Sequence, residues 1–171
     1  MTIIRPARPE DAANLAVLSA ETFSETFTYH PPEDLATYLA EAYTEAGYAR
    51  DIANPNYGIW VAEQGGNLIG YVVASSAYLP HPELKSADGE IRRLYVRSEH
   101  QGQGLGSQLL EKALQWLLKD KPQRTLWLGV WSENYGAQRL YSHYGFKRVG
   151  DYYFEVGSTR DFEFIFRRDP R

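Results

Sequence analysis

The residues with the clearest chemical use are three glycines at alternate positions, Gly102, Gly104 and Gly106. They follow residues 90–96, whose β-branched and large side chains predict a strand, and they precede leucines that recur at helical spacing from residue 105. The first N–H groups of a helix have no partner within it, and the helix dipole leaves partial positive charge there. Glycine lets an anion approach these groups closely. The pattern therefore predicts a phosphate-binding loop.

The spacing of these glycines excludes two common nucleotide-binding motifs. A dinucleotide-binding G-x-G-x-x-G motif would need glycine at Ser107, and a P-loop would need lysine after Gly106. A tight strand-to-helix connection without a ligand is the structural alternative, but three alternating glycines favour an anion site. The pattern that remains is Gln101-x-x-Gly104-x-Gly106.

The glycine loop must be held by the elements around it. We expect strands over residues 2–5, 58–63, 68–77, 90–96, 126–131, 146–155 and 159–167. We expect helices over residues 10–27, from 32 to about 43, 48–53, 105–118 and 134–144. The strand, helix and strand around the loop predict one parallel pair in a largely antiparallel sheet, and hence a mixed α and β fold.

Two motifs in the second half of the chain resemble the GNAT superfamily of acyl-CoA-dependent N-acetyltransferases. The glycine pattern is similar to its pyrophosphate-binding signature, and N-x-x-A-x-x-x-Y-x-x-x-G-F from Asn134 to Phe146 is similar to a second signature. The two motifs stand in the expected order. Shorter segments across the chain, including Leu126 to Trp131, resemble the bacterial PaiA-type polyamine (spermidine/spermine) acetyltransferases.

This resemblance implies a fold and a reaction. The fold is α+β, with a central, mostly antiparallel twisted sheet of about six to seven strands, helices on both faces, and a single N-acetyltransferase domain over residues 1–171. The reaction is acetyl transfer from acetyl-CoA to a primary amine of a small cationic, polyamine-like molecule by direct attack. A peptide N-terminus or a lysine is the alternative acceptor, and a non-catalytic acyl-CoA sensor on the same fold is the alternative function.

The resemblance also assigns two catalytic residues. Tyr141 matches the tyrosine that the superfamily places near the cofactor sulfur, and an unperturbed phenol keeps its proton at neutral pH, so it can donate. Glu90 matches a glutamate that related enzymes use as a base, directly or through water. The structural alternatives are a core tyrosine on an amphipathic helix and an exposed glutamate paired with an arginine.

Binding of acetyl-CoA is assigned mainly to backbone groups. The expected residues are Leu94, Tyr95, Val96, Gln101, Gly102, Gln103, Gly104, Leu105, Gly106, Ser107, Asn134 and Tyr141. Many relatives carry arginine where Gln101 stands, so more of the phosphate binding falls to backbone N–H groups and to nearby Arg97. Asn134 alternatively caps its helix.

An acidic N-terminal region points to a cationic acceptor. Residues 1–60 carry nine carboxylates and three arginines. In the resembled family the N-terminal helices help form the acceptor groove, and a negative groove concentrates a polycation. Glu21, Glu25 and Asp34 are the expected groove residues, and solvated helix-face charges are the alternative.

Composition limits the remaining possibilities. The 171 residues contain no cysteine, which excludes disulfides, thiolate metal sites and a cysteine nucleophile, and which suits a cytoplasmic protein. A formal charge of −4 argues against nucleic acid as a partner, and no apolar run approaches a membrane span. The four histidines lack metal-ligand spacing, so no metal is expected. The expected partner is a small-molecule amine, and a homodimer is compatible with the sequence.

Overall fold

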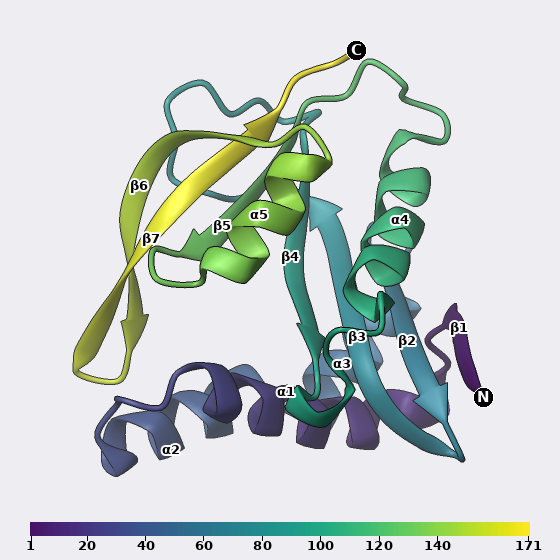
Figure 1. Cartoon of the computed structure of the whole chain (residues 1–171), viewed down its shortest axis with the longest axis vertical. Coiled ribbons are helices and arrows are strands. Elements are labelled where there is room, and N and C mark those ends of the chain that lie inside the picture. The colour runs from purple at the N-terminus through teal and green to yellow at the C-terminus, as the bar shows by residue number, and fades with distance from the viewer.

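The computed structural model describes residues 1–171 and contains one seven-stranded sheet, in the order β1-β2-β3-β4-β5-β7-β6 (Figure 1). The strands are β1 (Thr2–Pro6), β2 (Gly58–Gln64), β3 (Asn67–Ser76), β4 (Gly89–Val96), β5 (Leu126–Trp131), β6 (Lys147–Val156) and β7 (Thr159–Arg168). The α-helices are α1 (Ala12–Thr26), α2 (Pro32–Ala42), α3 (Glu45–Ala53), α4 (Leu105–Leu118) and α5 (Tyr135–His143). Two short 3₁₀ helices span Pro9–Asp11 and Ser98–His100.

Strand β3 shows why helices cover both faces of the sheet. Its side chains alternate, so Tyr71 and Val73 lie on one face and Val72 and Ala74 on the other, and all four are buried. Helices α1, α2 and α3 pack on the first face, and α4 and α5 pack on the second (Figure 1). The expected mixed fold, with a mostly antiparallel sheet between helices, is confirmed.

Helix α4 carries the most regular apolar face. Its buried side chains recur at spacings of three and four, and they are Leu105, Leu109, Leu110, Ala113, Leu114 and Leu117. They pack on the face of β2, β3 and β4 that includes Ala62, Val72 and Ile91. This packing fixes the start of α4, and with it the glycine loop, at the end of β4.

The sheet divides between β4 and β5, which form its only parallel pair. The pairing covers Gly89 with Leu126, Glu90 with Trp127 and Ile91 with Leu128, and then it ends. A bulge leaves Arg92 without a partner on β3, because Val73 pairs with Arg93 and Ala74 with Ile91. Beyond this point β4 and β5 diverge (Figure 1), so the sheet has an opening at its centre.

Some boundaries differ from those expected, for local reasons. Helix α3 begins at Glu45 rather than residue 48, because the hydroxyl of Thr44 accepts a hydrogen bond from the N–H of Gly47 at 3.0 Å and caps the helix. The expected helix from residue 10 is a 3₁₀ turn over Pro9–Asp11 that leads into α1. No helix here combines the length and the apolar character that crossing a membrane requires.

Candidate active site

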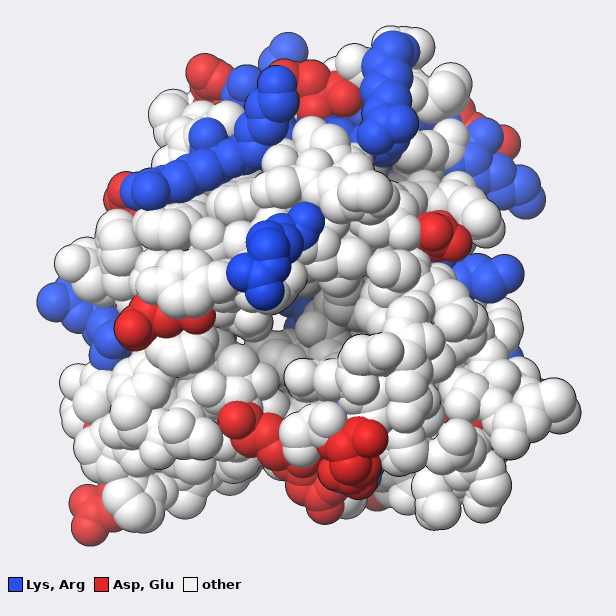
Figure 2. Space-filling view, in the orientation of Figure 1, with Lys and Arg blue, Asp and Glu red and all other residues white.

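Two cavities occupy the opening between β4 and β5. The loop cavity has a volume of about 310 Å³ and is lined by the glycine loop, the end of β4 and the start of α5. The aromatic cavity has a volume of about 320 Å³, and its lining includes rings from α1, α2, β5 and β6. The residues that line both are Leu94, Tyr95, Asn134, Ala137 and Tyr141. Figure 2 shows a hollow on this face, with acidic side chains gathered below it and basic ones above.

The glycine loop presents free backbone donors to the loop cavity. Gly102 and Gly104 have φ angles of 81° and 79°, in the left-handed region that favours glycine. The first backbone hydrogen bond that spans the start of α4 is donated by the N–H of Gln108 to the carbonyl of Gly104, at 3.1 Å. The N–H groups before it are therefore available to a ligand. Their arrangement suits an anion.

Of the other residues assigned to cofactor binding, some line the loop cavity and some do not. Leu94, Tyr95 and Val96 line the loop cavity beyond the last residue of β4 that pairs with β5. The side-chain amide of Gln101 donates to the carbonyl of Val96 at 3.0 Å, so it ties the loop to the strand. Gln103 and Ser107 belong to the same loop and helix start but do not line the cavity.

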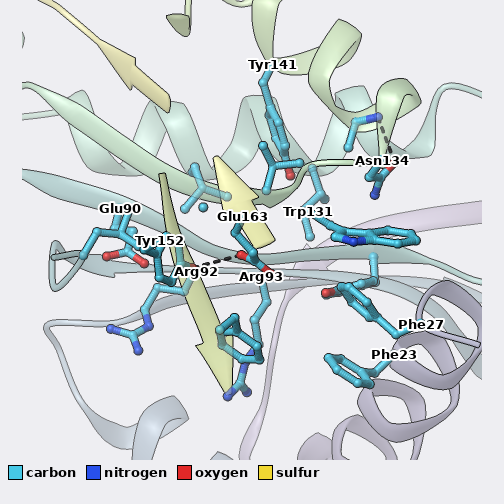
Figure 3. A pocket seen from close by; sticks show the side chains of 18 of the residues that line it. Phe23, Phe27, Glu90, Arg92, Arg93, Trp131, Asn134, Tyr141, Tyr152 and Glu163 are labelled. Atoms are coloured by element: carbon cyan, nitrogen blue, oxygen red, sulfur yellow. Dashed lines mark hydrogen bonds between the residues drawn. The ribbon is translucent and has the colours of Figure 1, made fainter. Parts of the chain in front are cut away.

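Tyr141 lies where the two cavities meet. Its ring extends from α5 into the opening (Figure 3), and its hydroxyl makes no hydrogen bond within the protein. Burial, followed by the nearby charge of Glu163, raises the pKa of Tyr141. The phenol therefore keeps its proton at neutral pH, as the sequence suggested, and it can act as a proton donor.

Asn134 also borders both cavities, and it caps α5. Its side-chain oxygen accepts a hydrogen bond from the N–H of Ala137 at 3.2 Å. The capping role considered from the sequence is therefore present. The amide nitrogen of the same side chain makes no hydrogen bond within the protein and remains able to donate to a ligand.

Glu90 lies on the wall of the aromatic cavity, and one oxygen of its carboxylate is already engaged. It accepts a hydrogen bond from the N–H of Tyr78 at 2.8 Å, which fixes the loop that follows β3. Burial raises the pKa of Glu90. Seen from Tyr141 in Figure 3, Glu90 lies beyond Tyr152. The expected base thus lines the aromatic cavity but not the loop cavity.

The three acids expected in the groove lie elsewhere. Glu21 pairs with Arg97, and Glu25 accepts a hydrogen bond from the N–H of Ser98 at 3.0 Å, so both fasten the segment after β4 to α1. Arg97, the arginine expected near the glycine loop, is thus paired with Glu21, and it also donates to the carbonyl of Leu68 at 3.2 Å. Asp34 accepts from the N–H and the hydroxyl of Ser158, both at 2.8 Å, and holds the β6–β7 turn. None of the three lines the aromatic cavity.

Glu163 is the carboxylate that the sequence did not single out. It is buried on β7 and accepts a hydrogen bond from the hydroxyl of Tyr152 at 2.9 Å (Figure 3). Burial raises the pKa of Glu163 to about 7. One sequence pattern could have indicated Glu163: along β7 the acids at 161 and 163 alternate with Phe162 and Phe164, so both acids lie on the same face of the strand. An acid on the inward face of a strand is rare without a function or a partner.

A second buried acid on β7 shares one proton with a histidine. The hydroxyl of Thr159 donates to the carbonyl of Val156 at 2.7 Å, so its oxygen accepts from Nδ1 of His30 at 2.9 Å. Nε2 of His30 lies 3.1 Å from Oδ2 of Asp161, so this pair holds a single proton between ring and carboxyl. Burial raises the pKa of Asp161 to about 6 and lowers that of His30. The pair fastens the α1–α2 connection to β7, two residues from Glu163.

Comparisons with known sequences agree with this geometry. The sequence model of the acetyltransferase (GNAT) family matches residues 20–146. An uncharacterized N-acetyltransferase encoded in the pepI 3′ region of Lactobacillus delbrueckii subsp. lactis is 30% identical over 164 residues, which cover 93% of this chain and 92% of the relative. An uncharacterized N-acetyltransferase of Mycobacterium bovis is 28% identical over 162 residues, covering 93% and 97%.

Solved structures share the fold. PaiA N-acetyltransferase from Thermoplasma acidophilum, in complex with coenzyme A, has a TM-score of 0.78 at 21% identity, with 99% of each chain covered. A GNAT-family acetyltransferase from Streptococcus pneumoniae has a TM-score of 0.74 at 21% identity, with 100% of each chain covered. The matched family model spans both signatures and most of the site. The chain therefore belongs to the GNAT family of acetyltransferases.

Proposed function

We propose that this N-acetyltransferase moves the acetyl group of acetyl-CoA to a primary amine of a small cationic, polyamine-like molecule, with residues 1–171 acting as one domain. Acetyl-CoA supplies a thioester carbonyl that is already activated, so the amine attacks directly and no protein nucleophile is needed. The observation that carries the proposal is the meeting of two cavities at Tyr141. One offers anion-binding N–H groups, and the other offers rings and buried carboxylates.

The loop cavity fits coenzyme A in its donor chemistry. A Cβ atom built on Gly102 or Gly104 meets no heavy atom within 4 Å, so the loop faces open space that a pyrophosphate can enter. The diverging end of β4, from Leu94 to Val96, offers backbone groups to the amides of the pantetheine arm. The complex of PaiA N-acetyltransferase with coenzyme A, on the same fold, supports this placement.

The aromatic cavity fits an amine that arrives as a cation. Ring faces attract ammonium groups, and the cavity walls include Phe23, Phe27, Tyr38, Trp131, Tyr152 and Phe154. Glu90 and Glu163 add two buried carboxylates. The guanidinium of Arg93 lies over the rings of Tyr43 and Tyr48, 4.8 and 5.6 Å from their centroids, and it donates to the hydroxyl of Tyr48 at 2.9 Å. This arginine is therefore held by tyrosines at the cavity wall.

Tyr141 is the proposed acid. Its hydroxyl is free of protein partners, it lies at the junction of the cavities, and its raised pKa keeps the proton available for the leaving sulfur. Glu90, the base suggested by the sequence, lines the same cavity and holds the loop after β3. The two roles require acetyl-CoA and the amine to enter from opposite sides of Tyr141.

An acceptor panel tests the proposal. Release of free thiol from acetyl-CoA is measured with spermidine, spermine, an uncharged primary amine of similar length, an amine that bears a carboxylate, and peptides with free N-termini. We expect the polyamines to give the highest kcat/KM, with a preference that weakens as salt screens the charges. Faster turnover of peptides, or of the carboxylate-bearing amine, would reassign the acceptor.

A further inference from the structure

We infer that Glu163 is the group that takes the proton from the acceptor ammonium, and that Glu90 is a positioning residue for the loop after β3. This inference rests on the proposed acetylation of an amine. It assigns the proton to a strand, β7, that lies outside both signature motifs. Three features of Glu163 support this role: its position in the sheet, the state of its two oxygens, and the space around it.

The register of the sheet aims Glu163 into the aromatic cavity. Glu163 pairs with Trp131 on β5 and with Tyr152 on β6. Directly paired residues of antiparallel strands project on the same face, so the three side chains lie in one row. All three line the aromatic cavity, and Figure 3 shows Glu163 between Tyr152 and Trp131. The carboxylate is thus held between two walls of the cavity.

One oxygen of Glu163 is anchored and the other is free. Oε1 accepts from the hydroxyl of Tyr152 at 2.9 Å. Oε2 makes no hydrogen bond within the protein, and it is not among the fully buried atoms that lack a partner, so it keeps contact with the cavity. This arrangement orients the carboxylate and leaves Oε2 to receive a proton. Glu90 is also anchored through one oxygen, but its Oε1 accepts from the backbone N–H of Tyr78, in the loop after β3.

A glycine on the neighbouring strand provides the space for this pair. A Cβ atom on Gly129 of β5 would lie 2.5 Å from the hydroxyl of Tyr152 and 3.3 Å from Oε1 of Glu163. Any side chain there would displace the anchored hydrogen bond. Gly129 itself lines the cavity, so its missing side chain also opens a path from the amine to Glu163.

The surroundings of Glu163 set its proton affinity. The ionizable groups that face it are Tyr152 from β6, Tyr141 from α5, Tyr95 from β4, Tyr38 from α2 and Asp161 from its own strand, with Glu90 beyond Tyr152. The pKa of each of these phenols is raised, so all four are neutral near pH 7. Burial raises the pKa of Glu163 to about 7, and the nearby charge of Asp161 adds to the effect. A carboxyl with this pKa accepts and returns a proton near neutral pH.

The step is a single proton transfer. One N–H bond of the acceptor R–NH3⁺ breaks, its electron pair stays on nitrogen, and an O–H bond forms at Oε2 of Glu163. The products are R–NH2, which is able to attack, and a neutral carboxyl still anchored by Tyr152. After the acetylated product leaves, the carboxyl releases the proton to solvent, so one proton is produced in each turnover.

Kinetics of isosteric variants test the assignment, with spermidine as the probe. In the wild-type protein, kcat/KM should rise with pH and level off above about pH 7, where Glu163 is ionized. In Glu163→Gln we expect a loss of about a hundredfold near pH 7. The variant should instead rise about tenfold per pH unit towards the pKa of the free amine, because only pre-deprotonated amine reacts. Tyr152→Phe should shift the levelling point to higher pH, because the hydrogen bond from Tyr152 lowers the pKa of Glu163 and its loss lets that pKa rise.

Glu90→Gln is the matched control, and it should keep the levelling point. A measurement without turnover adds a second readout. Spermidine is titrated calorimetrically into the protein with coenzyme A, in two buffers that differ in ionization enthalpy, at about pH 7. Proton release on binding is expected in the wild type and in Glu90→Gln but not in Glu163→Gln. If Glu90→Gln loses the levelling point and the proton release while Glu163→Gln keeps both, the assignment is overturned. If spermidine is neither acetylated nor bound, the proposed acceptor itself is wrong, and the same comparison is made with the amine that is turned over.

Discussion

The loop cavity and the aromatic cavity share a wall, but they are built in opposite ways. The loop cavity takes most of its lining from one continuous stretch, Leu94 to Gly106, which includes the start of α4, and α5 supplies much of the rest. The aromatic cavity depends on side chains from α1, α2, β4, β5, β6 and β7. Its walls are therefore assembled only when strands β4 to β7 and both helical layers are in place.

This difference teaches where specificity can change. Backbone donors are the same for every residue type, so the loop cavity is fixed by conformation and suits a cofactor that is constant. The rings and carboxylates of the aromatic cavity are side chains, so a single substitution can change its shape or charge and thereby its specificity for the acceptor. Tyr141 lines both cavities, so its position must suit the cofactor on one side and the acceptor on the other.

The largest effect should come from the shared wall. Tyr141→Phe removes only a hydroxyl, so coenzyme A should bind with unchanged affinity while kcat falls by about a hundredfold or more. Stopped reactions under chemistry-limited conditions measure the rate, and calorimetry measures the affinity. Tyr144→Phe is the control, because its hydroxyl instead bonds Glu111 at 2.6 Å, away from the cavities. Equal rates for Tyr141→Phe and the wild type would remove the acid role.

A loss of affinity for coenzyme A, caused by a change in the loop cavity, should be the next largest effect. Valine at Gly104 disfavours the left-handed φ of 79° by about 1–2 kcal/mol, and relaxing that strain moves the N–H groups. We expect coenzyme A to bind about tenfold more weakly, measured by calorimetry. Gly66→Val is the matched control, because Gly66 has a φ of 83° in a turn distant from both cavities and carries the same strain. Equal weakening in both variants would show a general loss of folding instead.

A smaller effect should be confined to the aromatic cavity. Gly129→Ala pushes on the hydroxyl of Tyr152, so the KM for spermidine should rise by about three- to tenfold while the affinity for coenzyme A stays unchanged. The double variant Gly129→Ala/Tyr152→Phe lacks the 2.5 Å contact and keeps only contacts of 3.3 Å, so its kinetics should be close to those of Tyr152→Phe alone. Additive losses in the double variant would mean that alanine acts through another contact.

The smallest effect should come from an acid outside both cavities. The pair between Glu21 and Arg97 leaves the Glu21 side chain 50% exposed, and such pairs contribute about 0–1 kcal/mol to stability. We expect Glu21→Gln to change the KM for spermidine by less than about twofold. A tenfold rise in KM would return Glu21 to the acceptor site that its sequence position suggested.

The two cavities also differ in how far the sequence could predict them. The glycine loop, Tyr141 and the order of strands and helices follow from patterns local in the chain, because hydrophobic periodicity and glycine spacing act over a few residues. The aromatic cavity joins Phe23 to Glu163, and no local pattern states which distant side chains meet. The composition of the N-terminal region predicts its negative charge but not where each acidic side chain points. Glu21, Glu25 and Asp34 point to loops and turns, where they stabilise the frame of the site.

The short pairing between β4 and β5 has a mechanical consequence. Three residue pairs join the β1–β4 half of the sheet to the β5–β7 half, so rotation between the halves is concentrated there. From Ile91 to Val96, β4 stays paired with β3 but not with β5, and this part is about 16 Å long at about 3.3 Å per residue. A hinge rotation of about 5° therefore moves its far end by about 1.4 Å, which exceeds the tolerance of a hydrogen bond. A small rotation at Gly89–Ile91 therefore produces a larger displacement of β4 at the mouth of the site.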